Sequence, residues 1–318
     1  MHIKPIRLRN LILPSNVAMA PMAGYTCYPL RMLCQKLGAG ICFTEMVSAN
    51  ALKYNDQANR RLLLTTPKER IKAVQLLESD PGIVERAACG ELLSEFDIID
   101  LNMGCPVPNV FKSGQGSALL SDMPRAAALI RACRRSGKIV TVKFRIGLKE
   151  DEPVAAEFAR MCEQAGADMI SIHGRSRSMM YDGAPYYDQI QLAKASVSIP
   201  VLANGGICNC KDADKMMERT GADGVMIGRY ALENPYIFAQ LTGRPVREDR
   251  YALLKEQEEL ALRHYDEPFA LSYLRSIASY LMKKRKGTKA YKQKMYQCGS
   301  LKELDLIFRA AFAEEVSL

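Results

Sequence analysis

Three side chains with acid–base or charge chemistry lie at the ends of short apolar runs in the sequence. Cys105 comes shortly after one such run, Lys143 lies within the next and His173 ends a third. A thiol in that position can act as a nucleophile or as a proton donor. An ammonium group inside an apolar run is costly unless it faces an anionic or electron-rich ligand. The three residues therefore predict a ligand site.

Each of these residues also has an ordinary structural interpretation. A free cysteine is most often a buried packing residue, a lysine can extend its ammonium to solvent, and a histidine can be a hydrogen-bonded part of a core. Polar groups recur at one end of several predicted strands, which favours a functional role for Cys105, Lys143 and His173. The other nine cysteines we interpret as packing residues.

Two turns rich in glycine point to an anion. Asn204, Gly205 and Gly206 follow one apolar run, and Gly228 and Arg229 follow the next. Glycine lets backbone N–H groups approach an anion, and an arginine can pair with it in a bidentate manner. Ordinary turn glycines are the alternative. We expect a phosphate here because these are the last two runs of a series, and many barrels bind phosphate after their last two strands.

The elements that must position these residues form an alternating series over the first 240 residues. Continuous apolar strands separated by helical patterns indicate a parallel sheet, and eight strands fit a (β/α)8 TIM barrel, an α/β fold, better than an open sheet. The tripeptide Gly-Ala-Asp at 166–168 and 221–223 fits a βα repeat, since its glycine suits a helix terminus. The predicted strands are 17–20, 41–44, 71–77, 97–101, 139–144, 169–173, 201–203 and 224–227.

After residue 240 the pattern changes to helices alone. Residues 241–245 are a predicted linker, because they combine Gly and Pro. We therefore expect a catalytic TIM barrel over residues 1–240 and a small all-helical C-terminal domain over residues 246–318. Its predicted helices are about 250–264, 267–284, 289–297 and 301–313.

The positive charge of the chain is concentrated in this helical tail. Residues 268–302 contain nine basic and no acidic residues, as many charges as the net charge of +9, and tyrosines are interleaved. Clustered cations neutralise phosphates, and aromatic faces stack on unpaired bases. The segment favours contact with nucleic acid, with a solvated helical face as the alternative.

The composition of the 318-residue chain, 48% hydrophobic and 25% charged, is that of an ordinary globular protein. It excludes disordered, collagen-like and disulfide-framework chains. Without a Cys-x-x-Cys pair and with only three histidines, no metal site is predicted, and Cys208 and Cys210 give a weak signal. Scattered thiols, and no apolar run suited to a signal peptide or a bilayer, predict a cytoplasmic protein without membrane contact. No obligate protein partner is predicted.

Taken together, the motifs resemble those of the tRNA-dihydrouridine synthases. The most specific is Asp-Leu-Asn-Met-Gly-Cys-Pro at 100–106, followed by Gly-x-Gly-Ser-Ala-Leu-Leu at 114–120. The resemblance covers residues 14 to about 240 and extends in architecture to the helical tail. Further matching elements are Ala-Pro-Met-Ala-Gly-Tyr-Thr at 20–26, Val-Lys-Phe-Arg at 142–145, His-Gly-Arg at 173–175, Asn-Gly-Gly-Ile at 204–207, and Ile-Gly-Arg at 227–229 followed by Asn-Pro at 234–235.

The resemblance implies FMN in the barrel mouth, NADPH as the reductant and a uridine of tRNA as the substrate. Lys143 would stabilise negative charge on the reduced flavin. The residues implied in binding FMN are Pro21, Met22, Ala23, Gln75, Lys143, His173, Asn204, Gly205, Gly206, Gly228 and Arg229. The residues expected to contact the tRNA are Asn102, Lys112, Arg145, Arg175, Lys283, Lys284, Arg285 and Lys286.

The implied reaction reduces the C5=C6 bond of uridine to give 5,6-dihydrouridine. Hydride passes from FMN to C6, and Cys105 is the expected general acid that protonates C5, since thiols are mostly protonated at neutral pH. The uridine must leave the tRNA stack, and cations of the tail would help by binding phosphates. Two features depart from the family's pattern. Many members of the family have a lysine soon after the Gly-Cys-Pro element, whereas here only Lys112 offers that charge. Gly206 stands at a position where an acidic residue is frequent in the family.

Two other functions fit parts of this pattern. A different FMN barrel, such as a dihydroorotate dehydrogenase, would act on a free pyrimidine and would leave the basic tail without a purpose. A flavoprotein-like scaffold that only binds RNA would not need Cys105, Lys143 and His173 together. We therefore predict a tRNA-dihydrouridine synthase, an oxidoreductase that depends on FMN and NADPH.

Overall fold

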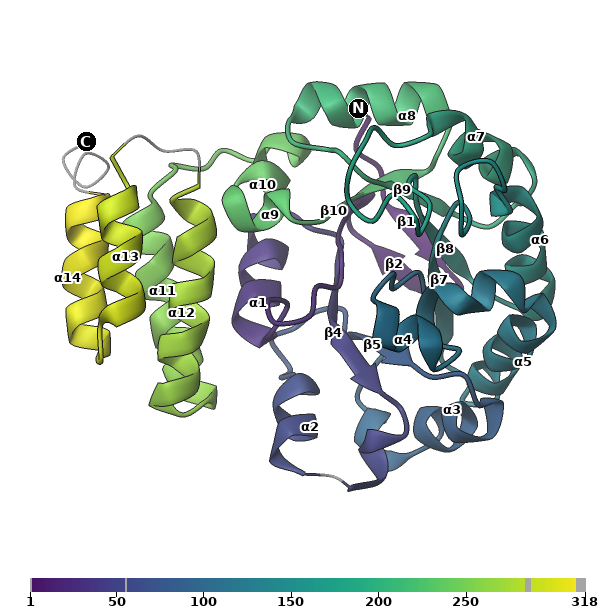
Figure 1. Cartoon of the computed structure of the whole chain (residues 1–318), viewed down its shortest axis with the longest axis horizontal. Coiled ribbons are helices and arrows are strands. Elements are labelled where there is room, and N and C mark those ends of the chain that lie inside the picture. The colour runs from purple at the N-terminus through teal and green to yellow at the C-terminus, as the bar shows by residue number, and fades with distance from the viewer. Residues whose placement is uncertain (1, 55, 284–286, 313–318) are drawn as a thin grey trace.

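The computed structural model contains a closed barrel of eight parallel strands followed by a helical C-terminal region (Figure 1). The structure describes residues 2–54, 56–283 and 287–312. The predicted TIM barrel is confirmed, and each predicted strand is present, with ends that differ by a few residues. In order around the barrel the strands are β3 (Val17–Met19), β4 (Ile41–Ser48), β5 (Ala73–Leu77), β6 (Ile98–Met103), β7 (Ile139–Arg145), β8 (Met169–His173), β9 (Val201–Asn204) and β10 (Gly224–Ile227), which pairs with β3.

Helices cover the outside of the barrel. Gly166 and Gly221 end two of them in the left-handed conformation, with φ of 100° and 64°, as the repeated tripeptide predicted. The sequence pattern of residues 82–93 is helical throughout, but in the structure the chain leaves the helix before Gly90 and resumes as a short 3-10 turn. The helices are α1 (Tyr28–Leu37), α2 (Gln57–Leu62), α3 (Pro81–Ala88), α4 (Pro108–Lys112), α5 (Met123–Arg134), α6 (Ala155–Ala165), α7 (Tyr187–Ala195), α8 (Cys210–Thr220), α9 (Tyr230–Glu233) and α10 (Ile237–Thr242). The 3-10 segments are η1 (Ala51–Tyr54), η2 (Glu91–Leu93) and η3 (Gly116–Ser121).

A short antiparallel hairpin, β1 (Ile6–Leu8) and β2 (Leu11–Leu13), was not predicted from the sequence. Its buried side chains belong to the same apolar cluster as Ile98, Met169 and Met226 of the barrel strands. The end of the barrel interior beside this hairpin is therefore filled by apolar side chains. The inward positions farther along the same strands are polar, and they begin the site described below.

The C-terminal region consists of α11 (Arg250–His264), α12 (Glu267–Leu281), α13 (Lys289–Gln297) and α14 (Leu301–Ala311). The predicted helices agree with these bounds, while the division at residues 240 and 246 stays a prediction. α11 packs on α1, and an ion pair of 2.8 Å joins Lys36 to Glu256 across this contact. Among the helices of the described residues, none combines the length and the apolar character that crossing a bilayer requires.

A buried ion pair fixes α1 beside the barrel mouth. Arg31 is only 1% exposed and binds the Glu69 carboxylate through two nitrogens, at 2.7 and 3.0 Å. Its remaining N–H groups donate to the carbonyl oxygens of Thr26 and Leu64. Because both charges are fully paired, the segments that carry the mouth residues near α1 are held in one arrangement.

Candidate active site

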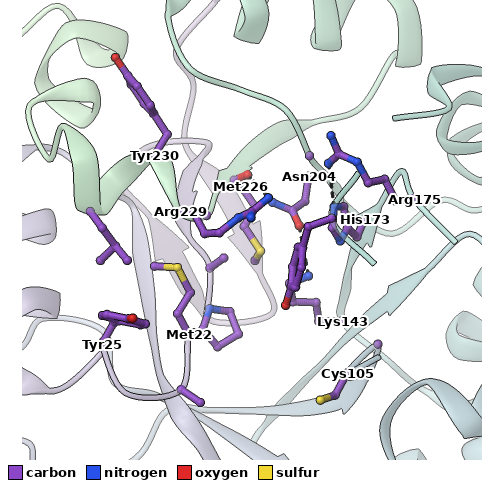
Figure 2. Close-up of a pocket in the computed structure, with 18 of the residues that line it drawn as sticks. Met22, Tyr25, Cys105, Lys143, His173, Arg175, Asn204, Met226, Arg229 and Tyr230 are labelled. Carbon is purple, nitrogen blue, oxygen red and sulfur yellow. Dashed lines mark hydrogen bonds between the residues drawn. The ribbon is translucent and has the colours of Figure 1, made fainter. Parts of the chain in front are cut away.

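A cavity of about 560 Å³ opens at the carboxyl ends of the barrel strands, where a TIM barrel places its functional groups. Figure 2 shows side chains from separate strands converging on it. The structure thus brings together most of the residues predicted from the sequence. Those lining the cavity are Pro21, Met22, Ala23, Gln75, Asn102, Cys105, Lys143, Arg145, His173, Arg175, Asn204, Gly205, Gly206, Gly228, Arg229 and Lys283.

One of the predicted residues lies away from the cavity, and three are not among the described residues. Lys112 is exposed at the end of α4 and does not line the cavity. Lys284, Arg285 and Lys286 lie outside the described residues. The predicted contact of these four lysine and arginine side chains with tRNA therefore stays a prediction.

Cys105 sits in a tight turn directly after β6. The side-chain oxygen of Asn102 accepts hydrogen bonds from the backbone N–H groups of Gly104, at 3.2 Å, and Cys105, at 2.9 Å. On the other side, the Cys105 carbonyl accepts a bond of 3.1 Å from Ser117 N. Gly116 has a φ of 60°, and a Cβ at this position would lie 2.9 Å from Cys105 Cβ. The Gly-x-Gly-Ser motif therefore supports the turn that presents the thiol to the cavity.

Beneath this turn a buried carboxylate organises two amides. Asp100 is 1% exposed and accepts bonds from Gln75 Nε2, at 2.7 Å, and Thr141 Oγ1, at 2.6 Å. Gln75 Oε1 in turn accepts a bond of 2.9 Å from Asn102 Nδ2. Burial raises the pKa of Asp100 to about 6, while the bonds from Thr141 and Gln75 and the charge of Lys143 act in the opposite direction. Asp100 belonged to the predicted motif but had no predicted role.

Lys143 points into the cavity from β7. Its Nζ donates to Asn204 Oδ1 at 3.2 Å, and Asn204 is held in this orientation because its Nδ2 donates to Met226 O at 2.7 Å. Burial lowers the pKa of Lys143 to about 8, and the nearby charge of Arg145 acts in the same direction. The ammonium is thus paired with a neutral amide rather than a carboxylate, which leaves it available to an electron-rich ligand.

His173 lies among cations and is neutral. Burial, together with the charges of Lys143, Arg145 and Arg175, holds its pKa well below the usual range. Arg175 Nη1 lies 3.3 Å from His173 Nε2, the contact dashed in Figure 2, so Nε2 accepts this bond and Nδ1 carries the proton. The same guanidinium binds the carbonyl of Gly183 at 2.6 Å, which fixes the loop after β8.

Arg145, predicted to contact substrate, is largely engaged by the protein itself. It is 2% exposed, and it donates to the carbonyls of Gly104, Ser176 and Met180 at 3.0, 2.9 and 2.7 Å. Its guanidinium also lies 5.3 Å from the centre of the Tyr181 ring. Arg145 therefore joins the Cys105 turn to the loop after β8, and a contact with substrate stays a prediction.

Several lining residues escaped the sequence analysis. Tyr181 comes from the loop after β8 and lies under Arg229, with the guanidinium 4.4 Å from its ring centre. Tyr25 meets Tyr280 of α12 edge-on, with ring centres 5.3 Å apart, and a hydrogen bond between them is the main cause that raises the pKa of Tyr25 to about 12. Glu233 of α9 pairs with Lys283 at 2.6 Å. Only the tertiary fold brings these loop and tail residues to the mouth, so no local sequence pattern marks them as part of the site.

The donor set of the cavity fits a phosphorylated, electron-rich cofactor. Gly205 and Gly206 adopt positive φ, 128° and 71°, in the turn after β9. A Cβ at Gly205 would lie 3.0 Å from the His173 ring, so the close approach of this turn needs glycine. Arg175 and Arg229 stand beside the two glycine turns, and cationic and N–H donors outnumber acids around this end of the cavity. Within the described ranges, no cluster of three or more His, Cys, Asp or Glu could hold a metal ion.

The sequence also matches a family model described as dihydrouridine synthase (Dus), over residues 18–316. The chain belongs to the dihydrouridine synthase family. The tRNA-dihydrouridine synthase B of Pseudomonas aeruginosa is 36% identical over 273 residues, 82% of each chain. That of Pseudomonas putida is 33% identical over 324 residues, 97% of this chain and 95% of the relative. The activity of this Dus chain is that of a tRNA-dihydrouridine synthase, an oxidoreductase.

Solved structures with the same fold are more distant. A morphinone reductase variant in complex with tetrahydroNAD matches with a TM-score of 0.56 at 14% identity, over 78% of this chain and 92% of that one. The old yellow enzyme homologue from Zymomonas mobilis matches with a TM-score of 0.55 at 13% identity, over 77% and 93%. At this identity the likeness shows the barrel fold of the Dus chain.

Proposed function

We propose that the chain reduces uridines of tRNA with FMN held in the cavity, NADPH as the reductant and Cys105 as the general acid. Membership of the family implies a flavin. The observation that carries the proposal is the convergence of Cys105, Lys143 and the Gly205–Gly206 turn on one cavity. Proton donor, cation and anion site are the three groups that a flavin-dependent reduction of an enone needs.

The residues around the cavity divide into those for the ring and those for the phosphate. Pro21, Met22 and Ala23 would pack against the ring, while Gln75 and Lys143 would bond its polar edge. When bound, FMN supplies the hydride that adds to C6 of the uracil. The residues that would hold the ribityl chain and phosphate are His173, Asn204, Gly205, Gly206, Gly228 and Arg229.

Cys105 holds the proton that the reaction consumes. Hydride addition at C6 leaves negative charge over C5 and the C4 carbonyl of the uracil, and the thiol Sγ gives its proton to C5. The turn at residues 102–105 limits where that thiol can be, since the Asn102 amide binds two of its N–H groups. Asn102, Arg145 and Arg175 are proposed to orient the base between the thiol and the ring.

The helical tail is proposed to bind the tRNA backbone. Lys283 of this region lines the cavity mouth and pairs with Glu233, so a phosphate would compete with that carboxylate. Basic side chains on α13, among them Lys289 and Lys294, are exposed. Their phosphate contacts would offset the cost of turning a uridine out of the stack.

The direct test is Cys105→Ala, with the two halves of the reaction followed separately. The variant should keep its flavin and should be reduced by NADPH at the wild-type rate. Its reoxidation by unmodified tRNA should slow by about 100-fold or more, the usual contribution of a general acid. Orotate in place of tRNA should leave the wild-type flavin reduced. Reoxidation of Cys105→Ala by tRNA at the wild-type rate would remove Cys105 from the mechanism.

A further inference from the structure

The hydrogen bonds beneath the Cys105 turn have a direction that the backbone imposes. Backbone N–H groups only donate, so the atom of Asn102 that faces Gly104 and Cys105 must be its oxygen. The Asn102 nitrogen then faces Gln75, which must present its oxygen at 2.9 Å. The Gln75 nitrogen is left pointing at Asp100, at 2.7 Å. Each amide has one permitted orientation as long as this last donor finds an acceptor.

Asp100 is the acceptor that ends this series. Its second oxygen is occupied by the Thr141 hydroxyl at 2.6 Å, and its side chain lies below the cavity rather than on its wall. The hydrogen bonds of Asp100 therefore lead to the cavity through Gln75 and Asn102, beside its charge interaction with Lys143. The titratable groups that interact with its charge are Lys143 on β7 and Cys133 on α5.

We propose that Asp100 is a positioning residue, which sets the orientation of the Gln75 and Asn102 amides and thereby fixes the turn that presents Cys105. The inference rests on the proposed role of Cys105. Without an acceptor at position 100, the Gln75 amide loses the partner that defines its orientation and can rotate. Its nitrogen can then face the Asn102 nitrogen, and the bond that holds the Asn102 amide from below is lost. The Asn102 oxygen then no longer holds the two N–H groups of the turn at all times, and the thiol loses its alignment with the base.

We expect the transfer of the proton from Cys105 to become slower. Asp100→Leu, which keeps the branch at Cγ, removes the acceptor, and misplacement of a reacting group by about 1 Å can cost about 100-fold in rate. We expect reoxidation of the reduced enzyme by tRNA to slow by about 30- to 100-fold. Reduction by NADPH does not use the thiol. Although Gln75 would also bond the flavin edge, the rate of reduction should fall by no more than about threefold.

Two variants distinguish an effect of the hydrogen bonds through Gln75 and Asn102 from a general effect of changing a buried residue. Asp100→Asn keeps an acceptor oxygen for Gln75 if its nitrogen faces the Thr141 hydroxyl, which can then accept. Thr141→Val removes the other bond of Asp100 at the same depth without touching Gln75. Both should reoxidise with tRNA within about fivefold of the wild type.

The experiment measures both half-reactions by the flavin absorbance of the full chain, for wild type, the three variants and Cys105→Ala. Slow reoxidation confined to Asp100→Leu and Cys105→Ala would support the inference. Normal reoxidation of Asp100→Leu beside a slow Cys105→Ala would overturn the inference alone. Equal loss in Thr141→Val, or equal slowing of both half-reactions in Asp100→Leu, would also overturn it, and a fast Cys105→Ala would overturn the proposed acid as well. Should Asp100→Leu fail to fold, Asp100→Ala removes the same acceptor, and the same outcomes apply.

Discussion

The Lys143 ammonium should destabilise the protein until a cofactor is bound, and Lys143→Met tests this. The structure gives the ammonium a single neutral side-chain acceptor, Asn204, and burial lowers its pKa from 10.5 to about 8. At about 1.4 kcal/mol for each factor of ten, the charged form costs about 3 kcal/mol in the folded state. Loss of the bond to Asn204 would cost about 1 kcal/mol. The flavin-free variant should therefore be more stable than the wild type by about 2 kcal/mol at pH 7.

The pH dependence of this difference has a definite sign. Below pH 8 the lysine is charged in both the folded and the unfolded chain, so the folded state bears the full cost. Between about 8 and 10.5 the folded lysine loses its proton while the unfolded one keeps it, and the cost declines to zero. The advantage of Lys143→Met should thus be present at pH 7 and nearly absent at pH 10.

Thermal unfolding of flavin-free protein at the two pH values measures the effect. For a chain of 318 residues, 2 kcal/mol corresponds to a rise in Tm of about 3 °C. With FMN added, the wild type should have the higher Tm of the two, since it gains the cation–flavin interaction and the variant does not. Lys149→Met, which changes an exposed ammonium, serves as the control and should shift Tm by less than about 1 °C. The reasoning would be refuted if flavin-free Lys143→Met were less stable than the wild type at pH 7. It would also be refuted if the rise in Tm over the wild type were as large at pH 10 as at pH 7.

Three further predictions follow from contacts around the mouth. Gly116→Ala should slow reoxidation by tRNA at least tenfold more than Gly114→Ala, because both glycines have positive φ but only the first would bring a Cβ to 2.9 Å from Cys105 Cβ; equal stopped-flow rates would contradict this. Arg31→Met should lower the free energy of unfolding by about 3–5 kcal/mol in urea titrations, since it leaves the Glu69 carboxylate buried and unpaired. Lys283→Ala should raise KM for tRNA a few-fold, with NADPH reduction unchanged. It should also reduce the slope of log K for tRNA against log salt concentration by about one, the share of one phosphate contact.

Much of the barrel could be predicted from local sequence, for a physical reason. Strands of a parallel sheet are buried on both faces, so β6 and β8 read as apolar runs and their ends are marked by polar or glycine residues. All such ends meet at one rim, so finding the strands also located Cys105, Lys143 and His173. The hairpin β1–β2 escaped because strands of three residues are too short to show a period.

What the sequence determined by itself is therefore the barrel, the rim and the identity of the reactive groups. Only the tertiary structure decided the partners of those groups: that Arg145 is committed to three carbonyls, that Tyr280 of the tail meets Tyr25, and that hydrogen bonds of two amides connect Asp100 to the Cys105 turn. Gln75, Asp100 and Thr141 belong to three different strands, and hydrogen bonds between their side chains depend on the register of those strands. Residue type and spacing fix which bonds are possible, and the packing of the closed barrel selects among them.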